Sequence, residues 1–232
     1  MIQIRDRGRR GRTQLGWLDS QHTFSFGEYR DPDHMGFHSL RVINDDRVIP
    51  GAGFATHSHR DMEIISYVLS GALSHRDSLG TSSVIRPGEV QRMSAGSGIT
   101  HSEFNASATE PVHFLQIWVM PDTLGITPGY EQREFPRADR RNRFRLVADR
   151  AGRDGAITIR QDVRLFAADL EANNTLTYEF AAGRFGWLQV ASGVVRLQDD
   201  ELRDGDGAQF TGETSVTLSS SIGAELLLFD LG

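Results

Sequence analysis

Cysteine and lysine are both absent from the 232-residue sequence, so all 25 basic residues are arginine. The absence of cysteine excludes a thiolate nucleophile, an iron–sulfur cluster and a cysteine-ligated zinc site. The absence of lysine excludes a Schiff-base enzyme and a P-loop nucleotide site. Without cysteine, disulfides give no information on the redox compartment. Metal chemistry with histidine and carboxylate ligands is not excluded by either absence.

Long apolar runs are also missing. No run approaches membrane-spanning length, and the N-terminal MIQIRDRGRRGR lacks the apolar core of a signal peptide. We therefore expect a cytoplasmic protein that does not enter a membrane. The net charge of −6 argues against direct binding to nucleic acid. Two arginine-rich stretches, residues 5–12 and 133–153, are open to two interpretations: solvated charge on an arm and a linker, or a patch for an anionic partner.

The apolar residues that are present occur in short, alternating runs. Examples are FHSLRVI, EIISYVL, HFLQIWVM and FGWLQVA, separated by clusters of glycine, proline, aspartate and asparagine. Period-2 alternation indicates half-buried strands, and no apolar stripe of helical period and length accompanies it. The sequence therefore predicts an all-β fold of the sandwich or barrel type. Its length fits one large β domain or two of about 100 residues each.

The distribution of histidine and proline predicts where the chain divides. All eight histidines fall between His22 and His113. Turn-forming residues follow the IWVM run, namely Pro121, Gly125, Pro128, Gly129 and Pro136. We expect a metal-binding domain over residues 1–120, a linker over 121–145, and a second, metal-free β domain over 146–232.

Two pairs of potential metal ligands have i, i+2 spacing: His57 with His59, and His101 with Glu103. Alternate residues of a strand share a face, so two such pairs converge inside a β-barrel. Three imidazoles and one carboxylate form a mononuclear site that suits Fe(II), Ni(II), Cu(II), Zn(II) or Mn(II). The glycine pairs in GAG and GSG do not indicate a dinucleotide site, because each lacks the third glycine and the strand-turn-helix context.

The spacing around these pairs resembles the two signature motifs of the cupin superfamily. They read Gly51-x5-His57-x-His59-x3-Glu63-x7-Gly71 and Gly96-x-Gly98-x2-His101-x3-Asn105. The chain departs from the pattern by one extra residue before Gly71 and by glycine at position 96, where many cupins have proline. The segments WLQVASG and LRDGDG in the C-terminal half resemble degenerate cupin motifs without histidines. This implies a bicupin, with two jelly-roll-like β-barrels.

Five longer segments resemble the pirin family, specifically bacterial pirins with quercetinase activity. They are GWLDSQHTFSFGEY, DPDHMGFHSLRVINDD, THSHRDMEIISYVLSG, MSAGSGITHSEFN and LQIWVMP. The resemblance covers essentially the first 135 residues. It implies dioxygenolytic cleavage of a flavonol such as quercetin, with release of carbon monoxide, and it favours Fe(II) as the metal.

The resemblance also decides between two glutamates. Many cupins use the first-motif glutamate as a ligand, whereas pirins use the one two residues after the second-motif histidine. It therefore implies Glu103 as a ligand, and Glu63 as a hydrogen-bond acceptor for a ligand imidazole or for Arg60. Asn105 is expected either to steady the site or to form a turn. The other histidines are expected to be structural or exposed, with some lining the cavity: His22, His34, His38, His75 and His113.

The implied mechanism has Glu103 accepting the proton of the flavonol's enolic hydroxyl before dioxygen reacts. Apolar side chains around the barrel mouth would exclude water, and four are predicted from nearness in sequence: Phe24, Phe37, Phe54 and Met93. An alternative is a non-catalytic, metal-dependent redox sensor that acts through a protein partner, as eukaryotic pirins are thought to do. A third possibility, a zinc-dependent sugar isomerase, lacks support because the chain has no lysine and no evident phosphosugar clamp.

Overall fold

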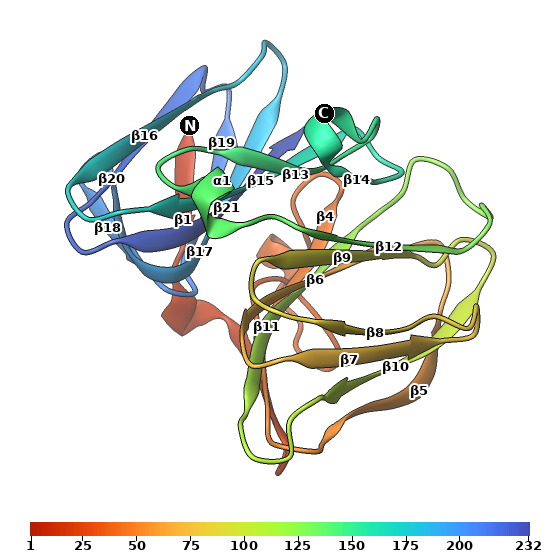
Figure 1. Ribbon diagram of the computed structural model, residues 1–232. Coiled ribbons are helices and arrows are strands. Elements are labelled where there is room, and N and C mark those ends of the chain that lie inside the picture. The colour runs from red at the N-terminus through yellow and green to blue at the C-terminus, as the bar shows by residue number, and fades with distance from the viewer. The chain divides into compact units, whose positions relative to one another are not determined.

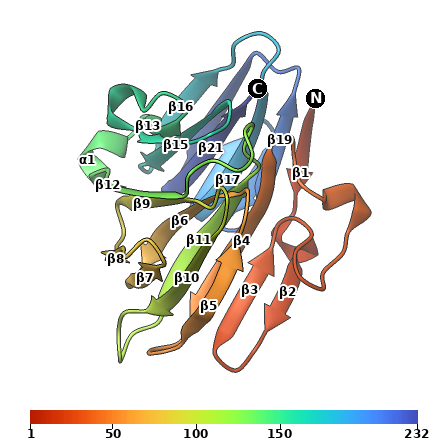
Figure 2. The ribbon, with the colours of Figure 1, turned by 90° about the vertical axis from the view of Figure 1, so that its right-hand side faces the viewer.

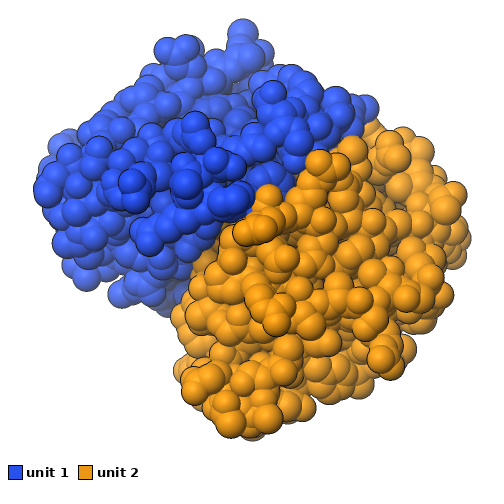
Figure 3. Space-filling view, viewed as in Figure 1, with its two compact units in different colours: residues 1–10, 135–156, 162–232 blue, residues 11–134, 157–161 orange.

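The computed structural model describes residues 1–232, almost all of them in strands and the turns between strands (Figure 1). The chain divides into two compact units, coloured in Figure 3. Unit 1 comprises residues 1–10, 135–156 and 162–232, and unit 2 comprises residues 11–134 and 157–161. The predicted all-β class, with two cupin barrels in one chain, is confirmed. The chain passes from unit 2 to unit 1 after residue 134, within the stretch predicted as a linker.

Unit 2 consists of two antiparallel sheets. Their strands are β2 (Gly11–Gln14), β3 (Leu18–His22), β4 (Leu40–Val48), β5 (Gly53–His59), β6 (Glu63–Ser70), β7 (Leu73–Asp77), β8 (Ser82–Ile85), β9 (Glu89–Ser94), β10 (Ile99–Asn105), β11 (Val112–Val119) and β12 (Gly129–Glu134). One sheet has the order β12-β9-β6-β11-β4-β3-β2 and the other β5-β10-β7-β8. Figure 1 shows the smaller sheet facing β6 and β9 of the larger one, and Figure 2 shows β2, β3 and β4 side by side. The remaining elements are the 3-10 turn η2 (Pro32–His34) and the short strand β14 (Ile157–Thr158).

The apolar runs of the sequence form the interior of unit 2. The first six residues of β6 are buried, because this strand lies in the middle of its sheet. One core cluster packs Val48, Val68, Ile85 and Phe114 together, and a second contains Ile64, Met93 and Ile99. Strand β5 is much less buried, so its inward residues remain accessible from a cavity.

Unit 1 is a second β-barrel-like unit. Its elements are β1 (Ile2–Arg5), η1 (Arg7–Arg9), α1 (Arg137–Arg140), β13 (Arg145–Asp149), η3 (Arg153–Gly155), β15 (Val163–Leu170), β16 (Asn174–Glu179), β17 (Phe185–Leu197), β18 (Asp200–Arg203), β19 (Gly207–Thr211), β20 (Ser215–Ser220) and β21 (Ala224–Leu231). The main path of its sheet runs β1-β19-β17-β21-β15-β13, and β16 pairs with β20. Strand β1 belongs here because Ile2 to Arg5 pair with β19. The core is aliphatic and aromatic, and this unit contains no histidine. None of the short helices has the length and apolar character that a membrane-spanning helix needs.

Candidate metal centre

Three of the predicted ligands meet inside unit 2. His57 and His59 lie on β5, His101 lies on the neighbouring strand β10, and their ligand nitrogens all fall within 4.8 Å of one another. The register of the two strands places His101 directly opposite His57. Their Nε2 atoms are 3.1 Å apart. Alternation along β5 puts His59 on the same face, as the spacing predicts.

A β-bulge fixes the orientation of His57. The register between β5 and β10 shifts after the His57–His101 pair, because Glu103 pairs with Phe54. In the bulged segment the carbonyl oxygen of Ala55 lies 2.8 Å from His57 Nδ1. Since a carbonyl only accepts, Nδ1 carries the proton and Nε2 presents its lone pair toward His101. Bulges commonly aim a side chain at a functional site in this way.

His101 is oriented by two hydrogen-bonded side chains of β7, His75 and Asp77. The Nε2 of His75 lies 3.1 Å from Asp77 Oδ2 and donates to it, so His75 Nδ1 is an acceptor. This Nδ1 is 3.5 Å from Nδ1 of His101, which therefore carries the proton. This series of hydrogen bonds from Asp77 through His75 to His101, here called the relay, leaves the lone pair of His101 on Nε2, the atom that faces His57.

His75 has a more specific place than the sequence indicates. It is expected to be structural or exposed, and the structure places it fully buried beside His101 and Glu103, in a second set of potential ligand atoms within 4.8 Å. The available signal was the i, i+2 spacing of His75 and Asp77, which puts both on one face of a strand.

Glu103, the fourth predicted ligand, joins His101 and His75 but is not within the same spacing of both β5 histidines. Its two oxygens are held from the facing sheet. The hydroxyl of Ser66 on β6 donates to Oε1 at 3.0 Å, and Nε2 of Gln116 on β11 donates to Oε2 at 2.6 Å. The side chain of Glu103 thus extends from its own sheet across the barrel interior to the facing sheet.

Burial controls the protonation of the cluster. It lowers the pKa of His101 to about 2, with the positive charges of His57, His59 and His75 adding to the effect. It lowers the pKa of His59 to about 4, with His57 contributing. Burial raises the pKa of Glu103 to about 7, against the hydrogen bonds from Ser66 and Gln116. His59 and His101 are therefore neutral at neutral pH, which is the form that binds metals.

The donor set fits a transition metal. Two Nε2 lone pairs that approach to 3.1 Å repel each other, and a cation between them relieves the repulsion. Metal–nitrogen bonds of about 2.1 Å place adjacent ligand nitrogens roughly 3.0–3.4 Å apart, in agreement with this separation. Three imidazoles with a nearby carboxylate match the nitrogen- and oxygen-rich sets preferred by divalent first-row metals.

Glu63 does not have the role predicted for it. Its buried carboxylate accepts a hydrogen bond from the main-chain N–H of Arg160 at 3.1 Å, and the prediction of an imidazole or Arg60 as its partner is wrong. Arg60 is exposed and pairs with Asp61.

The side chain of Asn105 forms a turn, since its Nδ2 donates to the carbonyls of Val48 and Glu110 while Oδ1 accepts from Ser107 N–H.

The remaining histidines lie outside the cluster. His22 contacts Thr13 and Asn44, His34 pairs with Asp31, and His113 pairs with Asp45. His38 has a φ of 53° and packs edge-on against Phe37. Of these, only His22 lines the cavity beside the cluster.

A cavity of about 430 Å³ opens next to the histidines. His57, His59 and Glu103 line one part of it, and its aromatic wall consists of Trp17, Phe26, Phe54 and Trp118. Phe54 was predicted, but Phe24, Phe37 and Met93 do not line the cavity. Phe24 is buried elsewhere, and Met93 packs against Ile64 and Ile99 in the core. Nearness in sequence to the ligands was a poor guide because the wall also comes from β11, which carries Trp118, and from the loops on either side of β3, which carry Trp17 and Phe26.

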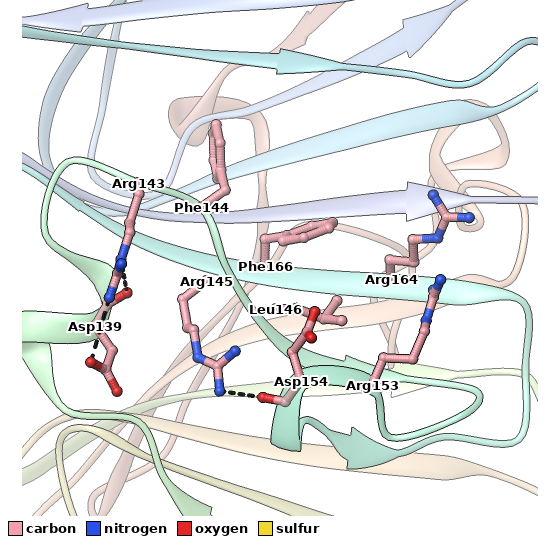
Figure 4. A pocket seen from close by; sticks show the side chains of 9 residues that line it. All are labelled: Asp139, Arg143, Phe144, Arg145, Leu146, Arg153, Asp154, Arg164 and Phe166. Atoms are coloured by element: carbon pink, nitrogen blue, oxygen red, sulfur yellow. Dashed lines mark hydrogen bonds and ion pairs between the residues drawn. The ribbon is translucent and has the colours of Figure 1, made fainter.

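A cavity of about 570 Å³ in unit 1 has a different chemistry (Figure 4). Arginines dominate it, and it contains no histidine or glutamate. Arg143 is hydrogen-bonded to Asp139, and Arg145 donates to the main-chain oxygen of Asp154. Part of the arginine-rich stretch is thus held by partners within its own unit, and this cavity offers no metal-binding set.

Comparison with known proteins agrees with this geometry. The pirin family model matches residues 4–119, and a model described as the quercetinase C-terminal cupin domain matches residues 146–231. The chain is 45% identical over 231 residues to quercetin 2,3-dioxygenase of Escherichia coli K12, covering 100% of this chain and 99% of that protein. It is 43% identical to a putative quercetin 2,3-dioxygenase of Mycobacterium bovis, with 99% and 95% covered. The crystal structure of the bacterial pirin YhhW from Escherichia coli in complex with nickel(II) matches with a TM-score of 0.94 and 44% identity, covering 100% of this chain and 99% of that one. The chain therefore belongs to the pirin family.

Proposed function

We propose that this protein is a metal-dependent dioxygenase that cleaves a flavonol such as quercetin and releases carbon monoxide. The observation that carries the proposal is the convergence of three imidazoles from β5 and β10 at the edge of an aromatic cavity. The cavity volume of about 430 Å³ lies in the range of about 300–1,000 Å³ that is usual for small-molecule sites. The full-length similarity to a quercetin 2,3-dioxygenase supports the choice of substrate.

In this proposal His57, His59 and His101 hold one divalent metal, and Glu103 is the fourth ligand. Iron(II) is the expected ion because the reaction consumes dioxygen, and the structure of YhhW in complex with nickel(II) supports binding of a divalent metal. When bound, the metal acidifies the substrate's enolic hydroxyl and provides redox chemistry toward dioxygen. Unit 1 serves as a metal-free barrel.

The chain's own residues have two further tasks. Glu103 accepts the proton of the enolic hydroxyl, because its carboxylate lines the cavity and lies within 4.8 Å of the ligand atoms of His101 and His75. Gln116 and Ser66 keep that carboxylate in place. The aromatic wall, including Trp118 packed edge-on against His59 at 5.0 Å, excludes water from the reacting substrate.

Oxygen uptake and carbon monoxide release with quercetin, measured on iron-reconstituted protein, test the proposal. We expect both gases to change in equal amounts, and we expect metal-stripped protein to be inactive. Iron-loaded protein that turns over none of a series of flavonols would contradict the proposal. Binding to a protein partner that depends on the state of the metal would then favour the regulatory alternative.

A further inference from the structure

We infer that Asp46 and Trp118 recognise the substrate by two hydrogen bonds, so that the cavity selects planar aromatic ketones carrying a hydroxyl group remote from the reacting one. Asp46 accepts from that remote hydroxyl, and the indole N–H of Trp118 donates to a substrate oxygen. The inference rests on the proposed function and adds to it the side chains that determine which flavonol is bound.

Asp46 has an unsatisfied acceptor at the cavity. The residue is 2% exposed, it lines the cavity, and its Oδ1 has no hydrogen-bond partner. A buried carboxyl oxygen without a donor is costly, and such groups are few in folded proteins. The neighbouring polar groups do have partners: Asn44 contacts His22, and Asp45 contacts His113. Unlike them, Asp46 keeps an acceptor oxygen that a ligand hydroxyl can satisfy.

Trp118 supplies the complementary donor. Its Nε1 is also buried without a partner, and the residue lines the same cavity. Edge-to-face contacts with His59 at 5.0 Å and Phe26 at 5.4 Å hold the indole in place. A buried indole N–H usually finds an acceptor, so this one is suited to a ligand oxygen close to the imidazoles.

Strand register gives the spacing of the two groups. Strands β4 and β11 are paired, with Asp46 opposite Phe114, Asn44 opposite Gln116, and Val42 opposite Trp118. Asp46 and Trp118 therefore share one face, separated by four residue steps, or roughly 13 Å along the strands. Gln116, which holds Glu103, lies between them. This distance suits a molecule of three rings whose remote hydroxyl and reacting end are far apart.

Calorimetric titration without oxygen, where no turnover occurs, provides the test. The probes are quercetin and 3-hydroxyflavone, which keeps the reacting hydroxyl and the ketone but lacks the remote hydroxyls. We expect the parent protein to bind quercetin at least tenfold more tightly. Asp46→Leu should lose about tenfold or more in quercetin affinity and leave 3-hydroxyflavone nearly unchanged. Asp46→Asn, which keeps an acceptor oxygen, should restore most of the preference.

Trp118→Phe should weaken both probes, because both carry the ketone. Trp187→Phe, in the buried interior of unit 1 and outside this cavity, should change neither by more than about threefold. Metal content and thermal unfolding confirm that each variant is folded, and Asp46→Ala replaces Asp46→Leu if the latter does not fold. Equal binding of both probes by the parent, or an equal loss for both in the Asp46 variant, overturns this inference alone. Failure of the parent to bind either probe contradicts the proposed function and this inference together.

Discussion

Nδ1 of His101 lies 3.5 Å from Nδ1 of His75, a residue outside the predicted ligand set. His75 is in turn anchored on Asp77, whose other oxygen accepts from the N–H groups of Leu79 and Thr81. The β7 hairpin thereby fixes which nitrogen of His101 is free to bind a metal. Outer partners of this kind orient metal-binding histidines in many proteins.

The relay predicts an effect on metal affinity. In Asp77→Asn the new amide can donate to Nε2 of His75, which moves the proton of His75 to the nitrogen that faces His101. His75→Leu removes the acceptor for Nδ1 of His101. Each change should lower metal affinity by about 10–100-fold. Competition with a chromophoric chelator measures this directly. His113→Leu is the matched control, because His113 is also paired with a carboxylate but lies outside the cluster. Unchanged affinity in both relay variants would show that His75 has only a packing role.

The two glutamates should behave differently when converted to amides. Glu103→Gln keeps an oxygen for the metal but is far too weak a base, so it should retain much of its metal and lose about 10²-fold or more in quercetin turnover. Glu63→Gln should alter stability, because Glu63 accepts from Arg160 N–H, and leave turnover near the parent rate.

Turnover of the glutamate variants has to be compared at equal metal occupancy, since lost iron would otherwise appear as lost base catalysis. Near-parental activity in Glu103→Gln together with an inactive Glu63→Gln would mean that the two roles are reversed. If both variants remain active, the proton is accepted elsewhere.

Close approach of β5 and β10 makes Gly53 sensitive to substitution. A Cβ at this position would lie 2.2 Å from the carbonyl oxygen of Glu103. Gly53→Ala should therefore push the two strands apart, destabilise the protein by about 1–3 kcal/mol and weaken metal binding. Gly16→Ala is the control, because no atom lies within 4 Å of its Cβ. Chemical denaturation gives the stability difference, and equal midpoints for the two variants would refute the argument.

Metal stoichiometry should be one ion per chain, held entirely by unit 2. The double variant His57→Ala/His101→Ala removes two of the three converging nitrogens and should bind no metal in elemental analysis. Anomalous scattering from crystals of the parent should locate no transition metal in unit 1, which contains no histidine. Undiminished metal in the double variant, or a second ion in unit 1, would refute the assignment.

Much of the fold could be predicted from local sequence. Period-2 apolar runs identified the strands, and the i, i+2 pairs brought His57, His59 and His101 together because alternation along a strand is a local property. Residues 1–10 could not be assigned to unit 1 in this way. Their place depends on pairing between β1 and β19, which are separated by about 200 residues.

The parts of the site that escaped prediction depend on contacts between strands. Glu63 and Glu103 both follow a histidine motif, yet only the facing sheet decides that one meets Arg160 N–H and the other Ser66 and Gln116. The cavity wall likewise includes Trp17 and Trp118, which lie far in sequence from the predicted ligands His57, His59 and His101. The bulge at Ala55 changes the pairing of Glu103 and has no clear sequence signal.

Flavonol cleavage as a function of metal occupancy tests the central claim most directly. Metal-free protein is titrated with iron(II) under anaerobic conditions, then mixed with quercetin and oxygen, and carbon monoxide is quantified. The account predicts activity that rises linearly up to one equivalent of iron per chain and then stays constant, with no activation of the His57→Ala/His101→Ala variant. Activity that is independent of iron, or that is equal in the double variant, would contradict it.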